Sequence, residues 1–469
     1  MFISTRGYVG IYELIVRASK KNCESLVKKK LEILIFRKKK LPSLKFLFFF
    51  INIILSGKIF KNNRSKISFE NIEIGRFVIS NTLINFETYI NKLKFYVLLI
   101  KNFYFAGTII KSCDYYYYKY NISGAYVDHC GYLNGIIFSF FAQKKVAVYT
   151  NNYPHGIYFV DYKKNKKKYL LKYENSLKIN FKKKLNFFQK KKASSKLENL
   201  VKQKNFIPWL AKAKFSNPKN LNYQKFDYII YTHSFTDGQM WYGNDGFENT
   251  LEWFEFTLNA FVKTKKKILI KPHPNFYNRS FAKHAIWDRK LYDIIVKKYQ
   301  SFDNFYFLKN PIHNYKLLKK LNKNCIAISK FGSVILEAAY MNFRSISSIN
   351  TFYNKKFKIS NIYENREGYL KLLKTNYWKL DLPDKNNLYE LIYSLFYIYY
   401  SCYNEKNYYE NIIMRRLKLT TKSYKNLFFT QLGSKNLIKK YYLRKLFLLK
   451  KHDTSTIQKL SQKIWQVKE

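Results

Sequence analysis

Short apolar runs alternate with amphipathic segments through the second half of the chain. Residues 226–231, 268–270 and 325–329 are apolar runs too brief for helices, and polar turn residues follow them, which is typical of buried strands. Residues 247–262, between the first two runs, repeat apolar positions at helical spacing. The order of strand, helix, strand, helix, strand predicts a doubly wound sheet of parallel strands.

Two of these predicted strands end in turns of unusual chemistry. The second runs into KPHP (residues 271–274), and because two prolines separated by one residue continue neither a helix nor a sheet ladder, we expect His273 on a rigid loop. The third runs into KFGS (residues 330–333), after which a helix begins. Ligands of parallel α/β sheets bind outside the carboxyl ends of the strands, and a Gly-Ser turn at a helix start offers unpaired backbone N–H groups. We therefore predict an anion site where the two turns meet.

The first half of the chain has a weaker form of the same pattern. Residues 103–110, 124–127 and 145–149 are predicted strands, and residues 129–143 place apolar side chains at helical spacing. A strand, a helix and a further strand in this order form a βαβ unit, which predicts a parallel sheet. The chain is therefore expected to contain an N-terminal α/β domain as well as the C-terminal one.

Changes of composition predict how the chain is divided. Residues 161–222 are rich in lysine and have broken periodicity, and Pro208 and Pro218 interrupt them, as expected of a surface excursion and linker. Helical spacing returns after Pro383. The expected segments are a basic N-terminal segment (1–65), an N-terminal α/β domain (66–160), the lysine-rich excursion and linker (161–222), a C-terminal α/β domain (223–384) and C-terminal helices (385–469).

The most apolar run of the sequence lies near its start, at residues 44–56 (LKFLFFFINIILS). It is shorter than the roughly 20 residues that a helix needs to cross a bilayer. Basic residues flank it on both sides. Two interpretations stay open: a shallow helix at a membrane interface, or an ordinary buried helix.

Lysine and arginine total 86 against 30 acidic residues, a formal net charge of +56. A charge of this size commonly indicates nucleic-acid binding. Here lysine is abundant together with asparagine, isoleucine, tyrosine and phenylalanine, and the lysine runs are scattered along the chain. We therefore favour a solvated basic surface, with no specific nucleic acid as a partner. The charge also suits an anionic membrane face or an anionic glycan.

The five cysteines are far apart and include no C-x-x-C pair, which predicts a reducing compartment without disulfides or a zinc site. Glu13 and Arg17 interrupt the apolar part of the first 20 residues, where we find no small-residue cleavage site. We therefore expect no secretory signal. The expected location is the cytoplasm, either free or peripheral on the inner face of the membrane.

Several motifs of catalytic sites are missing from the sequence. It has no G-x-x-x-x-G-K-[ST] phosphate loop, no H-E-x-x-H zinc motif, no G-x-S-x-G nucleophile turn and no D-x-D metal motif. A transferase without these motifs would stabilise its leaving phosphate with histidine, lysine, hydroxyl groups and helix N-termini, all of which this chain supplies. We therefore predict no cofactor and no metal.

His273 is the strongest candidate, because an imidazole fixed between prolines can donate a hydrogen bond to a phosphate. Neighbouring groups in the two turns would assist it: the charge of Lys271, the backbone and hydroxyl of Gly332 and Ser333, and Ser329 at the strand end. Purely structural roles stay open, namely turn capping for His273 and helix capping for Ser333.

Three further candidates follow the first C-terminal strand, namely His233, Ser234 and Asp237 in the segment THSFTD. We place His233 near the donor phosphate or the acceptor, whereas an ordinary polar loop is the alternative for the other two. In the N-terminal domain, Asp128 follows the predicted strand at 124–127 and is the candidate base that deprotonates an acceptor hydroxyl. A helix-capping role for Asp128 and a catalytic role for His155 are alternatives.

The two turns together resemble a known family pattern. A strand that ends in K-P-H-P, followed by a strand, G-S-x-x-x-E and a helix, resembles bacterial capsule and surface-polysaccharide biosynthesis proteins of the GT-B type. Related patterns occur in capsule Kdo transferases, bacterial sialyltransferases and CDP-glycerol glycerophosphotransferases. The resemblance covers residues 227–348. Members often have His or Asp-Tyr before the G-S turn, where this chain has Lys330 and Phe331, which leaves the donor open.

The resemblance implies a fold and a set of roles. The fold would be α/β, with two Rossmann-like domains facing a cleft, GT-B-like, and C-terminal helices. His273 would bind the donor phosphate and Glu337 the ribose or base of the donor. A dipole partner at the helix start is the structural alternative for Glu337. The segment THSFTD is similar to a loop of the teichoic acid polymerases, with its proline and arginine replaced.

We therefore expect a metal-independent glycosyltransferase of capsule or surface-polysaccharide synthesis. Its partners would be a nucleotide sugar, for which a CMP-linked acidic sugar is one candidate, and a glycan or lipid-linked acceptor. A phosphotransferase that uses a CDP-polyol such as CDP-glycerol or CDP-ribitol is the nearest alternative, because it needs the same phosphate site. A non-catalytic component of capsule assembly or export is the alternative from a different class.

Overall fold

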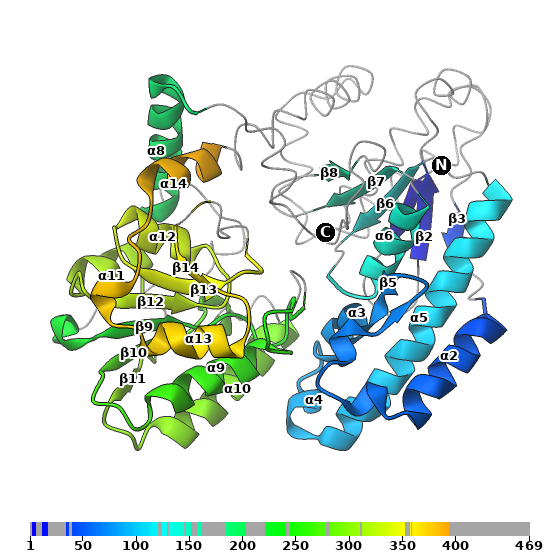
Figure 1. Cartoon of the computed structure of the whole chain (residues 1–469), viewed down its shortest axis with the longest axis horizontal. Coiled ribbons are helices and arrows are strands. Elements are labelled where there is room, and N and C mark those ends of the chain that lie inside the picture. The colour runs from blue at the N-terminus through cyan, green and yellow to red at the C-terminus, as the bar shows by residue number, and fades with distance from the viewer. Residues whose placement is uncertain are drawn as a thin grey trace.

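The computed structural model describes residues 2–5, 12–16, 34–36, 40–120, 124–128, 131–144, 147–151, 157–160, 184–202, 221–240, 244–277, 282–309, 312–351, 357 and 359–393. These residues form two lobes, one from the N-terminal part of the chain and one from residue 184 onward (Figure 1). The α/β fold class expected from the sequence is confirmed.

The C-terminal lobe contains a six-stranded sheet in which every pair of neighbouring strands is parallel. The strands lie side by side in the order β11-β10-β9-β12-β13-β14, so the order along the sheet is 3-2-1-4-5-6, that of a Rossmann-like fold. Their bounds are β9 (Tyr228–Tyr231), β10 (Ile268–Lys271), β11 (Phe305–Phe307), β12 (Ile326–Ser329), β13 (Ser345–Ser348) and β14 (Asn361–Tyr363). The strand order reverses between β9 and β12, which makes this the switch point where such sheets bind ligands.

Helices bury both faces of this sheet (Figure 1). They are α9 (Thr250–Phe261), α10 (Ala282–Tyr299), α11 (Asn314–Lys320), α12 (Val334–Tyr340) and α13 (Arg366–Lys374), with short 3-10 turns at Tyr223–Lys225, Pro274–Tyr277 and Tyr377–Lys379. Alternate residues of β9 enter different cores: Ile230 packs with α9 and α13, and Ile229 packs with α11. Because both faces are covered, the strands are apolar throughout, which is why they are recognisable in the sequence.

Two more helices belong to the C-terminal lobe. Helix α8 (Phe187–Val201) begins at an Asn186 capping box and packs with α14 (Lys385–Tyr393) against α12. The sequence placed residues 187–201 within a linker excursion, but apolar side chains at helical spacing dock this segment on the lobe. Helix α14 agrees with the first of the predicted C-terminal helices, and residues 394–469 lie outside the described part.

The N-terminal lobe has a helical core and small sheets. Its helices are α2 (Leu44–Leu55), α3 (Ile74–Thr82), α4 (Glu87–Ile90), α5 (Lys92–Tyr120) and α6 (Asn134–Gln143), with 3-10 turns at Lys58–Phe60 and Arg64–Lys66. Its strands are β1 (Phe2–Thr5), β2 (Tyr12–Val16), β3 (Leu34–Phe36), β4 (Ser68–Phe69), β5 (Ile72–Glu73), β6 (Gly124–Asp128), β7 (Ala147–Asn151) and β8 (Ile157–Val160). Strands β6 and β7 are parallel and α6 connects them, so the predicted βαβ unit is present, and β8 adds to it antiparallel.

The predicted strand at residues 103–110 is wrong, because this run lies in the middle of α5. Helix α5 runs through the lobe core and is buried on most sides here, so it has no polar face to mark a helical period. Gly107 allows α2 to approach closely, since a Cβ at this position would meet the Phe46 ring at 2.3 Å. Within the described residues α5 is the one helix long and apolar enough to cross a membrane, and half of its most apolar window is buried.

Candidate active site

Three loops meet at the switch point of the C-terminal sheet. His233 follows β9, His273 follows β10 and Gly332 follows β12, and these strands are adjacent in the sheet. The ring centroids of His233 and His273 are 5.5 Å apart, and the Phe331 ring lies edge-on to His233 at 5.5 Å. The proline-bounded histidine and the Gly-Ser turn therefore lie at one rim of the sheet, as the sequence predicted, with His233 between them.

Backbone contacts hold the His273 loop in place. The backbone N–H of His273 donates to Thr232 Oγ1 at 2.8 Å, and Thr232 N–H donates to the Lys271 carbonyl at 3.1 Å. On the other side, Phe276 N–H donates to the His273 carbonyl at 3.1 Å. These bonds connect the two histidine loops to each other. The backbones that carry the two imidazoles are therefore held at a fixed separation at the edge of the sheet.

Both imidazoles are held in the neutral form. Burial lowers the pKa of His233, and the nearby charge of Asp237 acts in the opposite direction. Burial lowers the pKa of His273 well below its usual range, and a proton on His233 or the positive charge of Lys271 lowers it further. A neutral imidazole offers one N–H donor and one acceptor nitrogen, so each ring can donate a hydrogen bond to an anion at neutral pH.

The Gly-Ser turn presents backbone and a hydroxyl beside the histidines. Gly332 has φ +135°, and a Cβ there would lie 3.9 Å from His233 Cδ2 and 3.6 Å from Ser329 Oγ. The Ser333 side chain is exposed and caps no backbone N–H among the described residues, so the capping role considered from the sequence is absent here. Ser329 is buried and its hydroxyl donates to the Phe331 carbonyl at 2.8 Å. Ser333 and not Ser329 therefore has an exposed hydroxyl at this rim.

Lys271 and Glu337 lie near enough to each other beneath the rim for each to influence the pKa of the other. The Lys271 side chain is buried and its Nζ lies 5.6 Å from the centre of the Tyr231 ring. Burial lowers the pKa of Lys271 to about 8, and Glu337 opposes that shift. Burial raises the pKa of Glu337 to about 7, while its carboxylate accepts a hydrogen bond from Asn314 Nδ2 at 2.8 Å. Lys271 thus supplies positive potential from below His273. Glu337 has a protein partner in Asn314, and its contact with the donor stays a prediction.

A buried carboxylate that sequence reasoning missed fixes the His233 loop. Asp288 of α10 accepts from Ser234 Oγ at 2.5 Å, from Phe235 N–H at 3.0 Å, and from the N–H and Oγ1 of Thr236 at 2.9 Å each. Burial raises the pKa of Asp288 to about 7, and the donors from Ser234 and Thr236 act against that rise. Ser234 therefore anchors the loop, as in the ordinary polar-loop interpretation. Asp288 looks like any polar position of an amphipathic helix, so the sequence carried no signal for it.

The same loop contacts the N-terminal lobe. Asp237 is exposed, and the Tyr132 hydroxyl donates to its carboxylate while accepting from Gly238 N–H at 3.0 Å. The Tyr89 hydroxyl donates to the Phe235 carbonyl. Beyond the loop, Arg64 pairs with Glu248, and Asn244 Nδ2 donates to Ser65 Oγ at 3.0 Å. Asp237 is therefore part of the contact between the lobes.

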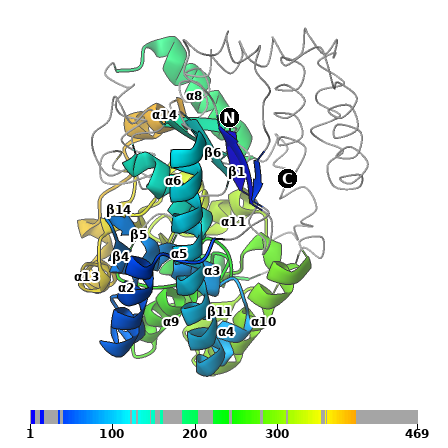
Figure 2. The ribbon, with the colours of Figure 1, turned by 90° about the vertical axis from the view of Figure 1, so that its right-hand side faces the viewer.

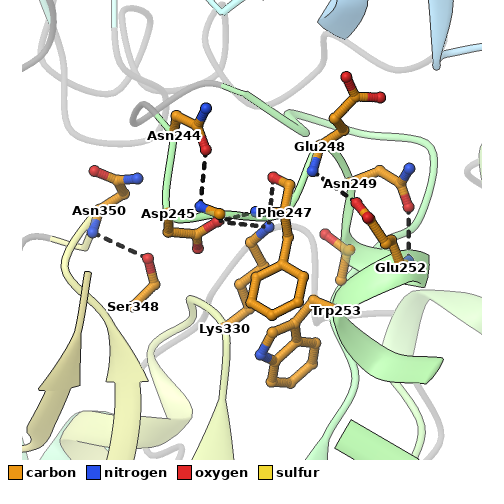
Figure 3. Close-up of polar contacts among 12 residues, drawn as sticks. Asn244, Asp245, Phe247, Glu248, Asn249, Glu252, Trp253, Lys330, Ser348 and Asn350 are labelled. Atoms are coloured by element: carbon orange, nitrogen blue, oxygen red, sulfur yellow. Dashed lines mark hydrogen bonds and ion pairs between the residues drawn. The ribbon is translucent and has the colours of Figure 1, made fainter. Parts of the chain in front are cut away.

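Lys330, where the resembling family often has His or Asp, is part of a buried ion pair. Its Nζ lies 3.1 Å from the Asp245 carboxylate, and both side chains are 1% exposed. Lys330 Nζ also donates to the Phe247 carbonyl at 3.4 Å, and Phe247 N–H donates to Asp245 at 3.3 Å. Figure 3 shows the Lys330 side chain extending into the loop that carries Asp245 and Phe247. Burial lowers the pKa of Lys330 and the charge of Asp245 opposes the shift, so this lysine ties a loop to β12.

The remaining candidates belong to the N-terminal lobe. Asp128 is the last residue of β6 and is paired in register with Asn151, which places it at the carboxyl end of its strand. Its side chain, together with His129 and His155, lies outside the described residues, so its role as a base stays a prediction. Within the described ranges no group of three or more His, Cys, Asp or Glu side chains is arranged to hold a metal ion.

No protein-family model and no curated protein sequence matches the chain. Two solved structures are similar to it. Sucrose-phosphate synthase from Thermosynechococcus elongatus is 12% identical, with a TM-score of 0.28 over 66% of this chain and 78% of that one. Methanocaldococcus jannaschii UDP-GlcNAc 2-epimerase, in complex with UDP-GlcNAc and UDP, is 11% identical, with a TM-score of 0.28 over 67% and 95%. The fold class of this chain accordingly rests on its own strand order and two lobes.

Proposed function

We propose that this chain is a GT-B-type glycosyltransferase that moves a sugar from a nucleotide-activated donor to a glycan or lipid-linked acceptor in surface-polysaccharide synthesis. The observation that carries the proposal is the convergence of His233, His273 and the Gly332–Ser333 turn at the switch point of a Rossmann-like sheet. That position is where α/β sheets bind nucleotides, and the groups present there are hydrogen-bond donors suited to phosphate.

The chemistry assigned to this rim is stabilisation of the leaving group. When the bond between the sugar and the donor phosphate breaks, the phosphate oxygen keeps the electron pair and gains negative charge. In the proposed reaction, the two neutral imidazoles and the Ser333 hydroxyl donate hydrogen bonds to that oxygen or its neighbours, without gaining or losing a proton. Lys271, whose pKa of about 8 leaves it mostly protonated at neutral pH, adds positive potential from beneath.

The acceptor would be activated from the other lobe. Asp128 stands at the carboxyl end of β6, and the proposal assigns it the proton of the attacking acceptor hydroxyl. The absence of an Asp-x-Asp motif from the sequence supports a metal-independent reaction, in which protein donors take the role that a divalent ion has in other transferases.

The nucleotide site can be tested by ligand-induced stabilisation of the full chain. We expect one nucleotide or nucleotide sugar of a panel to raise the melting temperature, by the equivalent of about 2.7 kcal/mol at about 100 times its dissociation constant. His273→Asn should remove most of this stabilisation. Thr264→Ala is the matched control, because it deletes a hydroxyl hydrogen bond at the opposite, amino edge of the sheet and should leave ligand binding unchanged.

Two results would overturn the proposal in different ways. If no nucleotide stabilises the chain, or if His273→Asn binds as the parent does, the rim is not a donor site. If a nucleotide binds and the acceptor product gains phosphorus together with a polyol, the chain is a phosphotransferase that uses a CDP-polyol. Unchanged surface glycan in cells that carry His273→Asn would support a role in assembly without catalysis.

A further inference from the structure

Helix α2 leaves a continuous apolar stripe on the surface of the N-terminal lobe. Its inner side is well packed: Phe46 lies against Gly107, and the rings of Phe50 and Tyr104 are 6.3 Å apart. The outer side is exposed and apolar at positions i, i+4, i+7 and i+11, namely Leu44 (74%), Phe48 (72%), Ile51 (50%) and Leu55 (81%). This spacing forms one line along the whole helix.

Helix α2, which carries the stripe, lies on the side of the N-terminal lobe that is turned away from the C-terminal lobe (Figure 1). Figure 2 shows α2 on this outer face, with α5 beside it. Phe60, just beyond the end of α2, is a further large apolar residue that is 43% exposed. Single exposed apolar residues are ordinary, but a contiguous line of large ones marks a surface that binds a partner.

The charge around the stripe is predominantly positive, although Glu70 forms an ion pair with Lys45 of α2. Between residues 33 and 69 the sequence has no acidic residue and nine basic ones, which are Arg37, Lys38, Lys39, Lys40, Lys45, Lys58, Lys61, Arg64 and Lys66. Of these, Arg64 is buried in its ion pair with Glu248, whereas Lys58, Lys61 and Lys66 are exposed next to the end of α2. An apolar line beside a cluster of cations is the composition of helices that lie at an anionic lipid interface.

We infer that the stripe of Leu44, Phe48, Ile51 and Leu55 docks on an anionic lipid surface, with α2 parallel to the membrane and the lysines at the headgroups. Twelve residues of helix extend about 18 Å, too short for the roughly 30 Å of a bilayer core, so α2 lies in the interface and does not cross it. A second copy of the chain would bring two cationic rims together in a protein of net charge +56, whereas an anionic bilayer attracts them.

The structure thus favours the interfacial helix over the ordinary buried helix, because α2 buries one face and exposes the other. The inference is independent of the proposed transfer reaction. It nevertheless suits a chain whose acceptor is lipid-linked, because docking through the N-terminal lobe would hold that lobe at the membrane surface.

Co-sedimentation of the full chain with lipid vesicles tests the inference. We expect binding to vesicles of phosphatidylcholine with about a third phosphatidylglycerol to be at least about tenfold tighter than to pure phosphatidylcholine. The double variant Phe48→Ser/Leu55→Ser should weaken this binding by about tenfold or more. Trp378→Ser is the matched control, because Trp378 is 70% exposed on the C-terminal lobe and its loss should leave vesicle binding unchanged.

A second pair of variants tests the charge. Lys58→Glu/Lys61→Glu leaves the stripe intact and should also weaken binding to the anionic vesicles by about tenfold, and added salt should do the same. Melting curves and nucleotide binding identify variants that remain folded. Equal binding by the parent and the Phe48→Ser/Leu55→Ser chain would overturn the inference. So would a stripe-dependent dimer in sedimentation velocity, because the stripe would then be a contact between copies.

Discussion

The imidazoles of His233 and His273 lie with their centroids 5.5 Å apart at the ends of two hydrogen-bonded parallel strands. Neighbouring strands are about 4.8 Å apart, so the sheet itself brings the rings this close. Two imidazolium ions at this distance repel each other, and buried Lys271 adds a third positive charge beneath them. The pair is therefore neutral in the folded chain at neutral pH.

This relationship predicts how stability depends on pH. Both histidines titrate below 6.5 in the folded chain and near 6.5 when unfolded, so below that pH the unfolded chain binds more protons. Their contribution to stability is complete above pH 6.5 and is lost as the pH falls, by up to about 1.4 kcal/mol per pH unit for each histidine. His273→Asn should reduce the change of unfolding free energy per pH unit by the contribution of one histidine. Urea unfolding of parent and variant between about pH 8 and pH 5 measures this change.

The comparison of parent and variant isolates the histidine from other buried groups. Asp288 and Glu337, each with a pKa of about 7, contribute with the opposite sign, because their folded forms hold protons that the unfolded chain releases above about pH 4. The contributions of Asp288 and Glu337 are the same in the parent and in His273→Asn. They therefore cancel when the pH dependence of the two unfolding free energies is compared. Identical slopes for parent and variant would show that His273 has the same pKa in the folded and the unfolded chain, and would contradict the prediction.

The buried pair of Lys330 and Asp245 predicts a non-additive effect of mutation. Asp245→Ala leaves the Lys330 ammonium buried without its counter-ion and should lower the free energy of unfolding by about 3–5 kcal/mol. The double variant Lys330→Met/Asp245→Ala removes both charges and should recover a large part of that loss. A double-mutant cycle of urea unfolding measures the coupling, and additive losses would contradict a direct pair.

Asp288 is expected to act on the site through the loop that it holds. Asp288→Ala leaves the hydroxyl and N–H donors of Ser234, Phe235 and Thr236 buried without their acceptor, which should cost about 3 kcal/mol or more of unfolding free energy. The stabilisation of the chain by a bound nucleotide should fall as well, because His233 directly precedes the segment that Asp288 holds. Asp293→Ala on the exposed side of the same helix is the control and should change stability by less than about 0.5 kcal/mol.

We expect position 332 to require glycine because of its backbone conformation, and not because a larger side chain would clash. A Cβ there would meet neighbours at 3.6 Å or more, which is ordinary contact, but φ +135° lies outside the range that L-residues adopt readily. Gly332→Ala should therefore cost about 1–3 kcal/mol and move the turn away from His233. Gly57→Ala, at φ +67° with no neighbour within 4 Å, is the control and should cost about 1 kcal/mol. A smaller cost for Gly332→Ala than for Gly57→Ala would show that the turn tolerates a side chain.

The parts of the fold and site that the sequence predicted are those with local signals. Prolines on both sides of His273 and the glycine before Ser333 mark strand ends whatever lies around them, and strands buried on both faces are apolar throughout. Ser234 shows the limit, because its partner Asp288 is 54 residues away and only the folded chain joins them. Residues 103–110, which were predicted as a strand, show a second limit. They lie in a helix that is buried on most sides, and such a helix lacks the polar face from which a helical period is recognised.

One feature of the fold links the two lobes to the phosphate rim. The segment from residue 232 to 240 carries His233 near its start and receives hydroxyl groups of Tyr89 and Tyr132 from the opposite lobe further along. Any change in the relative position of the lobes would therefore act on the segment that holds the imidazole, and a ligand that shifts this segment would bias the position of the lobes by the same free energy. If a nucleotide binds at the rim as proposed, its affinity and the relative position of the two lobes are therefore coupled.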